Sequence, residues 1–506
     1  MRSHHITAFL LLLLHSQRAY SDLGIQVNDA NSLANAGSTI ADPLMEFYKQ
    51  NQTEGIPGKL TDTWYIAGAM FMTLIQFWKA SGVDTYNSVV QHDLMFQAGE
   101  NYDYFSSNYS QWLGNDDQMF WGLAAITASE TGFPEVSGKP SWTSLARAVF
   151  NMQVNRWDDT TCDGGMRWQI WPYQAGYTMK NAISNGGLFE LSARLARFTK
   201  NDTYAEWAEK IFDWSTTTPL LNTNATIWNV ADSTSNEANC KDVGNNQWTY
   251  NYGTYLSGAA FMYNYTNGST KWEERVNNLL TSLTTKFFPE NFNNGTVLSE
   301  VTCEPILSCD RNQLGFKGYV AMWLAFTALL VPSTHDLILP KLQGSAAAIS
   351  KQCSGTGDGL ENLCGVRWHQ DTWDGSMGLE VQMSALGGVT GALMMLGDGS
   401  SGPQTIDENP DAAEHHIDTS EDEKDPTAKE KIDTGDRAGA WILTVVLAGL
   451  MLGAVGWLGI FDYGFVYMGY GHIDRLPRMS LLQSTTSHSS TIASRQSNSD
   501  LLSVTY

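Results

Sequence analysis

The chain has 506 residues, a formal net charge of −23 and a hydrophobic content of 42%. This length allows one large hydrophobic core or two domains. The negative charge argues against binding to nucleic acids or to anionic surfaces, which would repel the protein.

Residues 1–21 are predicted to be a secretory signal peptide. Arg2 precedes an apolar run from Ala8 to Leu14, and the tripeptide that ends at Ser21 offers a small-x-small cleavage site. We therefore expect the mature protein to enter an oxidising compartment, where cysteines can pair. The sequence alone leaves several pairings of the six cysteines open. Chain spacing favours two local disulfides and one long-range one: Cys303–Cys309, Cys353–Cys364 and Cys162–Cys240. Sequons that agree with secretion occur at Asn51, Asn108, Asn201, Asn224, Asn264, Asn267 and Asn294.

Residues 22–402 are predicted to form the folded domain, and their pattern is helical. Six segments are apolar nearly all round, which indicates helices buried on every side. These segments are Asp62–Lys79, Asn115–Glu130, Asn181–Phe198, Asn251–Tyr265, Leu314–Val331 and Gly378–Leu396. Amphipathic helices are predicted between them, for example Trp142–Asn155, Tyr204–Trp214, Trp272–Phe287 and Asp336–Gln352.

Alternation of buried and one-sided helices, with a period near 60 residues, predicts an all-α (α/α)6 barrel with six inner and six outer helices. A plain helical solenoid is the main alternative. The segments that lead into the inner helices are rich in amides, carboxylates, Trp and Tyr, as in Gln247–Gly253 and Trp368–Gly375. Such groups at equivalent repeat positions predict a cleft in which aromatic rings stack on sugars and amides bind hydroxyl groups.

The segment Gly114–Gly122 places two neighbouring carboxylates, Asp116 and Asp117, at a predicted helix start. Acidic residues in a first turn are often only capping residues. Here Asn115 is expected to cap the helix, which leaves the two carboxylates for other work. Cleavage of a glycosidic bond needs one carboxyl group as acid and a second as nucleophile or base. In this hypothesis the helix dipole keeps one carboxylate ionised, while crowding and burial raise the pKa of the other.

No cofactor and no metal are predicted. The sequence lacks a P-loop, a G-x-S-x-G elbow and an H-E-x-x-H zinc motif. The acidic cluster Asp158, Asp159 and Asp163 fits a solvated loop better than a calcium site.

The C-terminal part is predicted to anchor the protein. An acidic linker, residues 403–437, precedes the uncharged apolar segment 438–461, which is long enough to form a transmembrane helix. Residues 462–506 form a Ser-rich tail that is predicted to be disordered. The signal peptide predicts that the folded domain lies outside the cell, on a single-pass anchor in the plasma membrane.

Several motifs resemble glycoside hydrolase family 76, and in particular the mannan endo-1,6-α-mannosidase-like proteins of fungal cell walls. They are N-D-D-Q-M-F-W-G, K-N-A-I-S-N-G-G, W-T-Y-N-Y-G and a later F-K-G. The resemblance covers residues 30–400. It implies an (α/α)6 barrel that cleaves α-1,6-linked mannose with retention, with Asp116 as nucleophile and Asp117 as general acid/base. The residues expected to contact substrate are Trp121, Trp168, Asn181, Asn185, Tyr250, Asn251, Asp310, Lys317 and Asp374.

The resemblance also implies partners: mannan or the mannose core of a GPI anchor as donor, and cell-wall glucan as an acceptor in transglycosylation. Three alternatives stay open at this point. One is a mannan-binding surface receptor without activity, and another is a structural tether between wall and membrane. The third is a different (α/α)6 carbohydrate-active enzyme or polysaccharide lyase.

Overall fold

The computed structural model describes residues 22–61, 63–106, 110–397, 402–410, 412 and 441–454. The predicted signal peptide, most of the linker, the tail and the sequon at Asn108 lie outside these residues. The chain divides into two units, Met1–Ala428 and Lys429–Tyr506.

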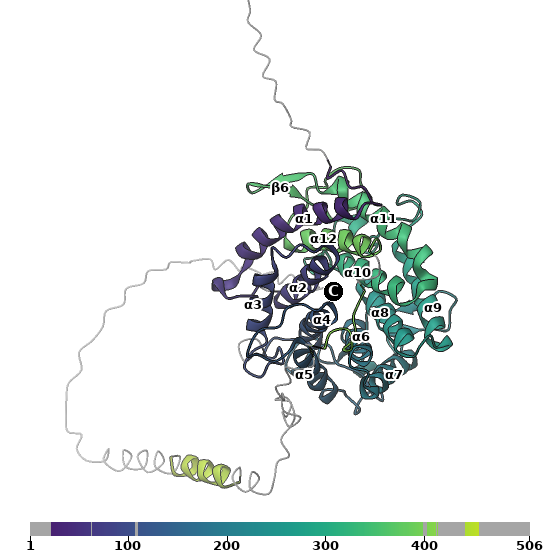
Figure 1. Cartoon of the computed structure of the whole chain (residues 1–506). Coiled ribbons are helices and arrows are strands. Elements are labelled where there is room, and N and C mark those ends of the chain that lie inside the picture. The colour runs from purple at the N-terminus through teal and green to yellow at the C-terminus, as the bar shows by residue number, and fades with distance from the viewer. Residues whose placement is uncertain are drawn as a thin grey trace, which may run out of the picture. The chain divides into compact units, whose positions relative to one another are not determined.

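In the described part of the first unit, twelve α-helices alternate between an inner and an outer ring (Figure 1). The inner helices are α2 (Trp64–Ser81), α4 (Asn115–Thr131), α6 (Ala182–Thr199), α8 (Thr249–Tyr265), α10 (Phe316–Leu330) and α12 (Leu379–Met394). The outer helices are α1 (Ala30–Asn51), α3 (Asn87–Gln97), α5 (Trp142–Asn155), α7 (Asp202–Thr217), α9 (Thr270–Phe287) and α11 (His335–Gln352).

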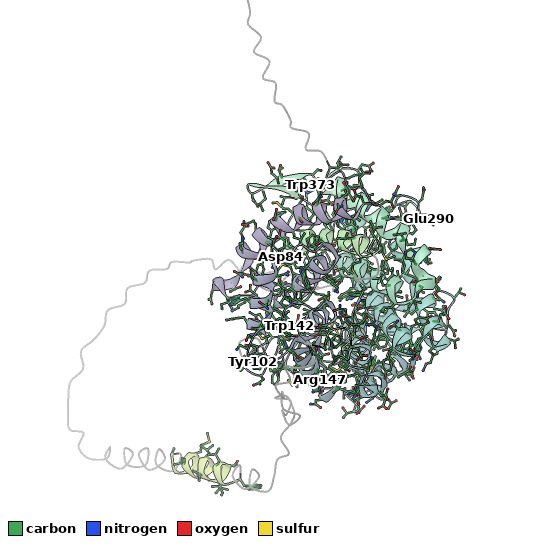
Figure 2. All side chains as sticks on the ribbon, in the orientation of Figure 1. Asp84, Tyr102, Trp142, Arg147, Glu290 and Trp373 are labelled. Carbon is green, nitrogen blue, oxygen red and sulfur yellow. A yellow bond between two sulfur atoms is a disulfide. The ribbon has the colours of Figure 1, made fainter. Side chains whose placement is uncertain are left out.

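Each inner helix packs against the next inner helix, and α12 packs against α2, so the ring is closed. Closure excludes the open solenoid and confirms the prediction of a helical barrel. The inner helices are buried on nearly all sides because their residues are apolar or small. Side chains fill the space between the helices, as Figure 2 shows, and Trp142 of α5 is completely buried among them.

The contact between α10 and α12 depends on small residues. A Cβ atom added to Gly387 would lie 2.5 Å from the backbone oxygen of Gly318, and one added to Gly391 would lie 2.6 Å from the oxygen of Ala321. The two backbones therefore approach each other more closely than any larger residue allows. These glycines account for an inner ring that can close tightly.

Short irregular elements join the helices. The 3-10 turns are η1 (Thr53–Gly55), η2 (Asn236–Ala238), η3 (Glu304–Ile306) and η4 (Pro332–Thr334). Antiparallel strand pairs are β1 (Met179–Asn181) with β4 (Ser233–Ser235), β2 (Leu221–Asn222) with β3 (Asn229–Val230), and β5 (Gly355–Gly357) with β6 (Leu360–Leu363). The disulfides are Cys162–Cys240, Cys303–Cys309 and Cys353–Cys364, the pairs that chain spacing favours.

In the second unit, residues 441–454 form a helix whose apolar side chains are exposed. Among the described residues, no helix is both long enough and apolar enough to cross a membrane. The predicted span 438–461 lies only partly within the residues that the structure describes.

Candidate active site

The inner helices all begin at one end of the barrel, because inner and outer helices alternate along the chain and each outer helix returns it. This end therefore collects the first residues of α2, α4, α6, α8 and α10. Tyr65, Asp116, Asn181 and Tyr250 all come from or directly precede these helix starts. The topology thus brings polar side chains from distant parts of the sequence to one place.

Asp116 and Asp117, called here the carboxyl pair, lie in the first turn of α4. The N-cap residue is Gly114, and its N–H donates to Oδ2 of Asp117 at 2.6 Å. The N–H of Asp117 donates to Oδ1 of Asp116 at 3.1 Å. The prediction that Asn115 caps this helix is wrong, because its side-chain amide donates to the carbonyl oxygen of Arg167 instead, at 2.9 Å. Asp117 itself supplies the capping contact.

Gly114 leaves room for both carboxyl groups. A Cβ atom added to this residue would lie 2.4 Å from Oδ1 of Asp116 and 3.2 Å from Oδ2 of Asp117. Because both distances start from one point, the two oxygens lie within roughly 6 Å of each other. The two carboxyl groups therefore converge on the same side of the helix start.

Burial dominates the electrostatics of the carboxyl pair. It raises the pKa of Asp117 to about 6. Burial raises the pKa of Asp116 as well, and the neighbouring charge of Asp117 adds to this effect. The expectation that the helix dipole keeps Asp116 ionised while Asp117 alone is raised is therefore wrong. Two neighbouring carboxyl groups with raised pKa values share a proton as they titrate.

The carboxyl pair is deep and yet accessible. Both residues are surrounded by enough protein to be strongly desolvated, but both keep partial solvent exposure. Groups with these two properties line a concave surface, since a convex surface would leave them well hydrated. The carboxyl pair therefore faces a recess that can admit a ligand.

Asn181 and two tyrosines surround the carboxyl pair. Asn181 precedes α6 and caps it by accepting the N–H of Ser184 at 3.2 Å. Its side chain is also hydrogen-bonded to Asp116. Because its oxygen is used by the cap, its NH₂ group is the donor to the carboxylate.

The tyrosines are Tyr65 of α2 and Tyr250 of α8, both half-buried. Burial raises the pKa of each phenol, and the negative charge of nearby Asp116 raises it further. Tyr65 donates to Oδ1 of Asn312 at 2.9 Å, while the ring of Tyr250 stacks on Phe316 at 3.7 Å. Both phenols therefore stay neutral and can bind a hydroxyl group of a ligand.

Sequence reasoning missed Asp232, which lies between β3 and β4. Its carboxylate accepts the side-chain amide of Asn251 at 3.1 Å, and it is close enough to Tyr250 to raise the pKa of that phenol. Burial also raises the pKa of Asp232. The only sequence signal was an acidic residue in a short irregular segment, where no strand was predicted.

Five residues predicted to contact substrate have fully buried side chains, so the prediction of a direct contact is wrong for them. They are Trp121, Asn185, Asn251, Lys317 and Asp374.

Trp121 belongs to the core, stacked on Trp64 at a ring distance of 4.9 Å. Asn185 holds the backbone of Met166 through two hydrogen bonds, at 2.8 and 3.0 Å. Both residues therefore support the surrounding structure by packing and hydrogen bonding.

Lys317 pairs with buried Glu304 at 2.7 Å, and its ammonium lies 3.9 Å from the ring centre of Trp368. Asp374 accepts the backbone N–H of Arg367 at 2.8 Å and so fixes its own loop. These charges stabilise the loops that enter α10 and α12.

The other predicted contacts keep an accessible surface. Trp168 and Tyr250 are half-buried and Asp310 is exposed, while Asn181 is almost buried but reaches Asp116. Asp310 also caps its own turn by accepting the N–H of Gln313 at 3.1 Å. Among the described residues, no group of three or more His, Cys, Asp or Glu side chains is arranged to hold a metal ion.

A helical barrel with two convergent carboxyl groups at its open end, surrounded by amides and phenols, defines a carbohydrate-cleaving enzyme. The chain belongs to glycosyl hydrolase family 76, whose family model matches residues 32–405. The protein is therefore a glycoside hydrolase.

Relatives with established names cover most of the chain. Mannan endo-1,6-alpha-mannosidase DCW1 of Saccharomyces cerevisiae is 38% identical over 468 residues, covering 89% of this chain and 98% of the relative. The crystal structure of Dfg5 from Chaetomium thermophilum in complex with glucosamine is 39% identical, with a TM-score of 0.70. It covers 76% of this chain and 95% of that one.

A more distant structure shares the fold. It is an inactive variant of an α-1,6-mannanase from a Salegentibacter species, with two neighbouring aspartates changed to asparagine, in complex with α-1,6-mannotriose. The two proteins are 18% identical, the TM-score is 0.56, and 72% of this chain and all of that chain are covered.

Proposed function

We propose that the protein is a retaining, endo-acting α-1,6-mannosidase or transglycosylase that acts on mannan or GPI-anchor mannose glycans in fungal cell-wall biogenesis. The convergence of the carboxyl pair carries this proposal. Retaining glycosidases hold their two carboxyl groups about 5 Å apart, whereas inverting enzymes need about 6.5–9.5 Å to fit a water molecule. The oxygens of Asp116 and Asp117 that flank Gly114 lie within roughly 6 Å of each other, which is compatible with the spacing of a retaining enzyme.

In the first step, Asp116 attacks the anomeric carbon while Asp117 gives its proton to the departing O6 oxygen. The glycosidic bond breaks, a mannosyl ester forms on Asp116, and the leaving chain departs with the proton. Asp117, now ionised, then removes a proton from water or from a sugar hydroxyl, which attacks the ester and releases Asp116.

Asp116 is the better nucleophile of the two because its donors hold it in place. The N–H of Asp117 and the NH₂ group of Asn181 both reach its carboxylate. The shared proton suits this division of roles. A glycosidic oxygen that accepts a hydrogen bond from Asp117 draws the proton to that residue and leaves Asp116 ionised.

Exposed aromatic side chains on the segments that lead into α4 and α6 support endo action, which requires that several sugar units be held at once. Trp112, two residues before Gly114, is 76% exposed, and Tyr173 is 67% exposed. The hydroxyl of Tyr173 donates to the backbone of Gln111 at 3.2 Å, so the two aromatic residues lie on connected loops. Exposed rings on such segments are available to stack on the faces of sugar units.

Incubation of the purified protein with an α-1,6-mannooligosaccharide, followed over time, tests the proposal. Shorter products would indicate hydrolysis and longer products would indicate transfer, and the anomer released first would report retention. Saturable binding without any product would instead favour the alternative of an inactive mannan-binding receptor. Asp117→Asn is the matched control, because it should keep binding and lose every product.

We also propose that the enzyme is secreted and held at the plasma membrane by residues 438–461, with its barrel facing the wall and cell-wall glucan as acceptor. The apolar segment, the N-terminal signal pattern and the sequons support this location. Protease treatment of intact cells tests it. Degradation of the barrel with survival of a C-terminal fragment is expected, and full protection of the barrel would exclude the proposal.

A further inference from the structure

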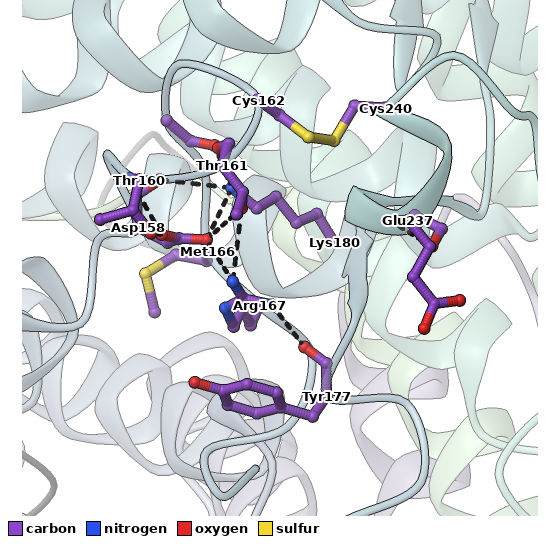
Figure 3. A network of polar contacts seen from close by, with 12 residues as sticks. Asp158, Thr160, Thr161, Cys162, Met166, Arg167, Tyr177, Lys180, Glu237 and Cys240 are labelled. Carbon is purple, nitrogen blue, oxygen red and sulfur yellow. Dashed lines mark hydrogen bonds and ion pairs between the residues drawn. A yellow bond between two sulfur atoms is a disulfide. The ribbon is translucent and has the colours of Figure 1, made fainter.

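The ammonium group of Lys180, the residue directly before Asn181, is enclosed by a loop of residues 158–164 (Figure 3). It donates to the carbonyl oxygens of Asp158 at 3.3 Å, of Thr161 at 2.7 Å and of Gly164. The carboxylate of Asp158 lies 3.2 Å away, and the Lys180 side chain is completely buried. The ammonium group therefore meets four oxygens, all supplied by this loop.

Asp158 connects Lys180 to a second cation. Its carboxylate lies 2.7 Å from the guanidinium of Arg167 and accepts hydrogen bonds from Thr160 and Thr161. Burial alone would raise the pKa of Asp158, but these hydrogen bonds and the charge of Lys180 outweigh burial and hold it below its usual range. The carboxylate therefore stays ionised in acidic surroundings.

The loop is also fixed from outside. The disulfide Cys162–Cys240 joins it to the segment that follows β4, and the indole N–H of Trp214 donates to the carbonyl of Cys162 at 2.9 Å. The contacts with Lys180 hold this loop from inside, and the disulfide and the hydrogen bond from Trp214 hold it from outside, so the loop is a rigid support. A purely solvated acidic loop would need neither contact.

Arg167 and Lys180 are each linked to the carboxyl pair through one asparagine. The carbonyl oxygen of Arg167 accepts the side chain of Asn115, the residue directly before Asp116. Lys180 directly precedes Asn181, whose amide holds the carboxylate of Asp116. The two asparagines belong to different segments of the chain. Both Arg167 and Lys180, to which they are linked, pair with the carboxylate of Asp158.

We propose that Asp158, Arg167 and Lys180 form a charged clamp that positions Asn115 and Asn181 against the carboxyl pair, and so sets the geometry and protonation of Asp116. The inference rests on the proposed function, because it assigns positioning residues to that reaction. The three residues of the clamp act through the two asparagines, and none of them is assigned a contact with the substrate. Small misplacements of reacting groups cost large factors in rate, so the clamp should affect turnover more than binding.

Asp158→Asn and Lys180→Met test the clamp, since each removes a charge with little change in size. We expect kcat to fall about 10- to 100-fold while KM changes less than about 3-fold. The pH profile of kcat should also shift, because a displaced Asn181 no longer stabilises ionised Asp116. The double variant should be little worse than either single variant, because both break the same unit.

Glu130→Gln is the matched structural control. It also removes a buried charge, at the far end of α4 about 20 Å from the carboxyl pair, where Glu130 pairs with Arg194. It should lower Tm without shifting the pH profile. Thr160→Val, at an exposed position that donates to Asp158, is a milder test should the charge variants fail to fold, with a loss of about 2- to 5-fold in kcat.

The outcomes separate the two proposals. An inactive wild-type protein would overturn the proposed function. An active wild type, together with clamp variants that keep its kcat and its pH profile at temperatures where they are folded, would overturn the clamp. A clamp variant that lowers Tm alone, as Glu130→Gln is expected to do, would reduce these residues to a structural role.

Discussion

Replacement of Asp117 by asparagine is expected to abolish activity and, at neutral pH, to stabilise the fold. Burial raises the pKa of this carboxyl from its usual 3.8 to about 6. A tenfold change in acidity is worth about 1.4 kcal/mol, so ionised Asp117 costs the folded protein about 3 kcal/mol at pH 7. The hydrogen bond from the N–H of Gly114 already lowers this pKa, and asparagine keeps an oxygen that can accept it, so the variant should recover most of this cost.

The size of the effect should change with pH. Well below pH 3.8 the carboxyl is protonated in both the folded and the unfolded chain, so its burial costs nothing and it accepts the N–H of Gly114 no better than an amide does. As the pH rises from about 4 to about 6, the wild type loses stability while the variant does not. The variant should therefore be about 2 kcal/mol more stable at pH 7 and about as stable as the wild type at about pH 3.

Thermal unfolding of both proteins across this pH range measures the difference. In a barrel of this size 1 kcal/mol corresponds to a Tm change on the order of 1–2 °C. Asp310→Asn is a suitable control, because Asp310 also accepts a backbone N–H but is exposed, and it should show no gain at pH 7. A variant at Asp117 that is less stable than wild type at every pH would refute the reasoning and leave Asp117 as a cap alone.

Three further predictions concern the neighbouring residues. Asn181→Ser keeps a helix cap but removes the donor to Asp116, so steady-state kinetics should show a fall of about 10- to 100-fold in kcat with little change in KM. Trp112→Ala should raise KM about 10-fold for long α-1,6-mannooligosaccharides but not for the shortest cleaved one, as kinetics with a length series would reveal. Glu130→Gln weakens the pairing of buried Arg194 and should cost about 3–5 kcal/mol in urea unfolding at pH 7, with unchanged activity per folded molecule.

The sequence predicted the barrel because the inner helices are apolar on all faces, a pattern that few other folds require. The starts of all six inner helices were predicted to within two residues. The outer helices α1 and α3 were not delimited. The first carries an internal proline, Pro43, and the second is short, so neither has a clear periodic signal.

The same all-round apolarity explains why individual site residues were misjudged. On an amphipathic helix the pattern itself shows which side chains face the interior, but an inner helix of the barrel has no such pattern. The sequence therefore could not show that Trp121, Asn185 and Lys317 point away from the recess. Only packing decides this, and the partners that bury them, such as Glu304 for Lys317, lie far along the chain or in irregular loops.

Capping and catalysis are not rival explanations for two neighbouring aspartates at a helix start. The free N–H groups of the first turn stabilise the carboxylates, and this is why a recess deep enough to desolvate them can hold two at once. Ionising both is costly there, because each raises the cost of charge on the other. The carboxyl pair therefore holds a proton to a higher pH than two exposed aspartates would, and the departing sugar oxygen needs that proton. The same burial that makes Asp117 costly as a cap thus makes it useful as an acid.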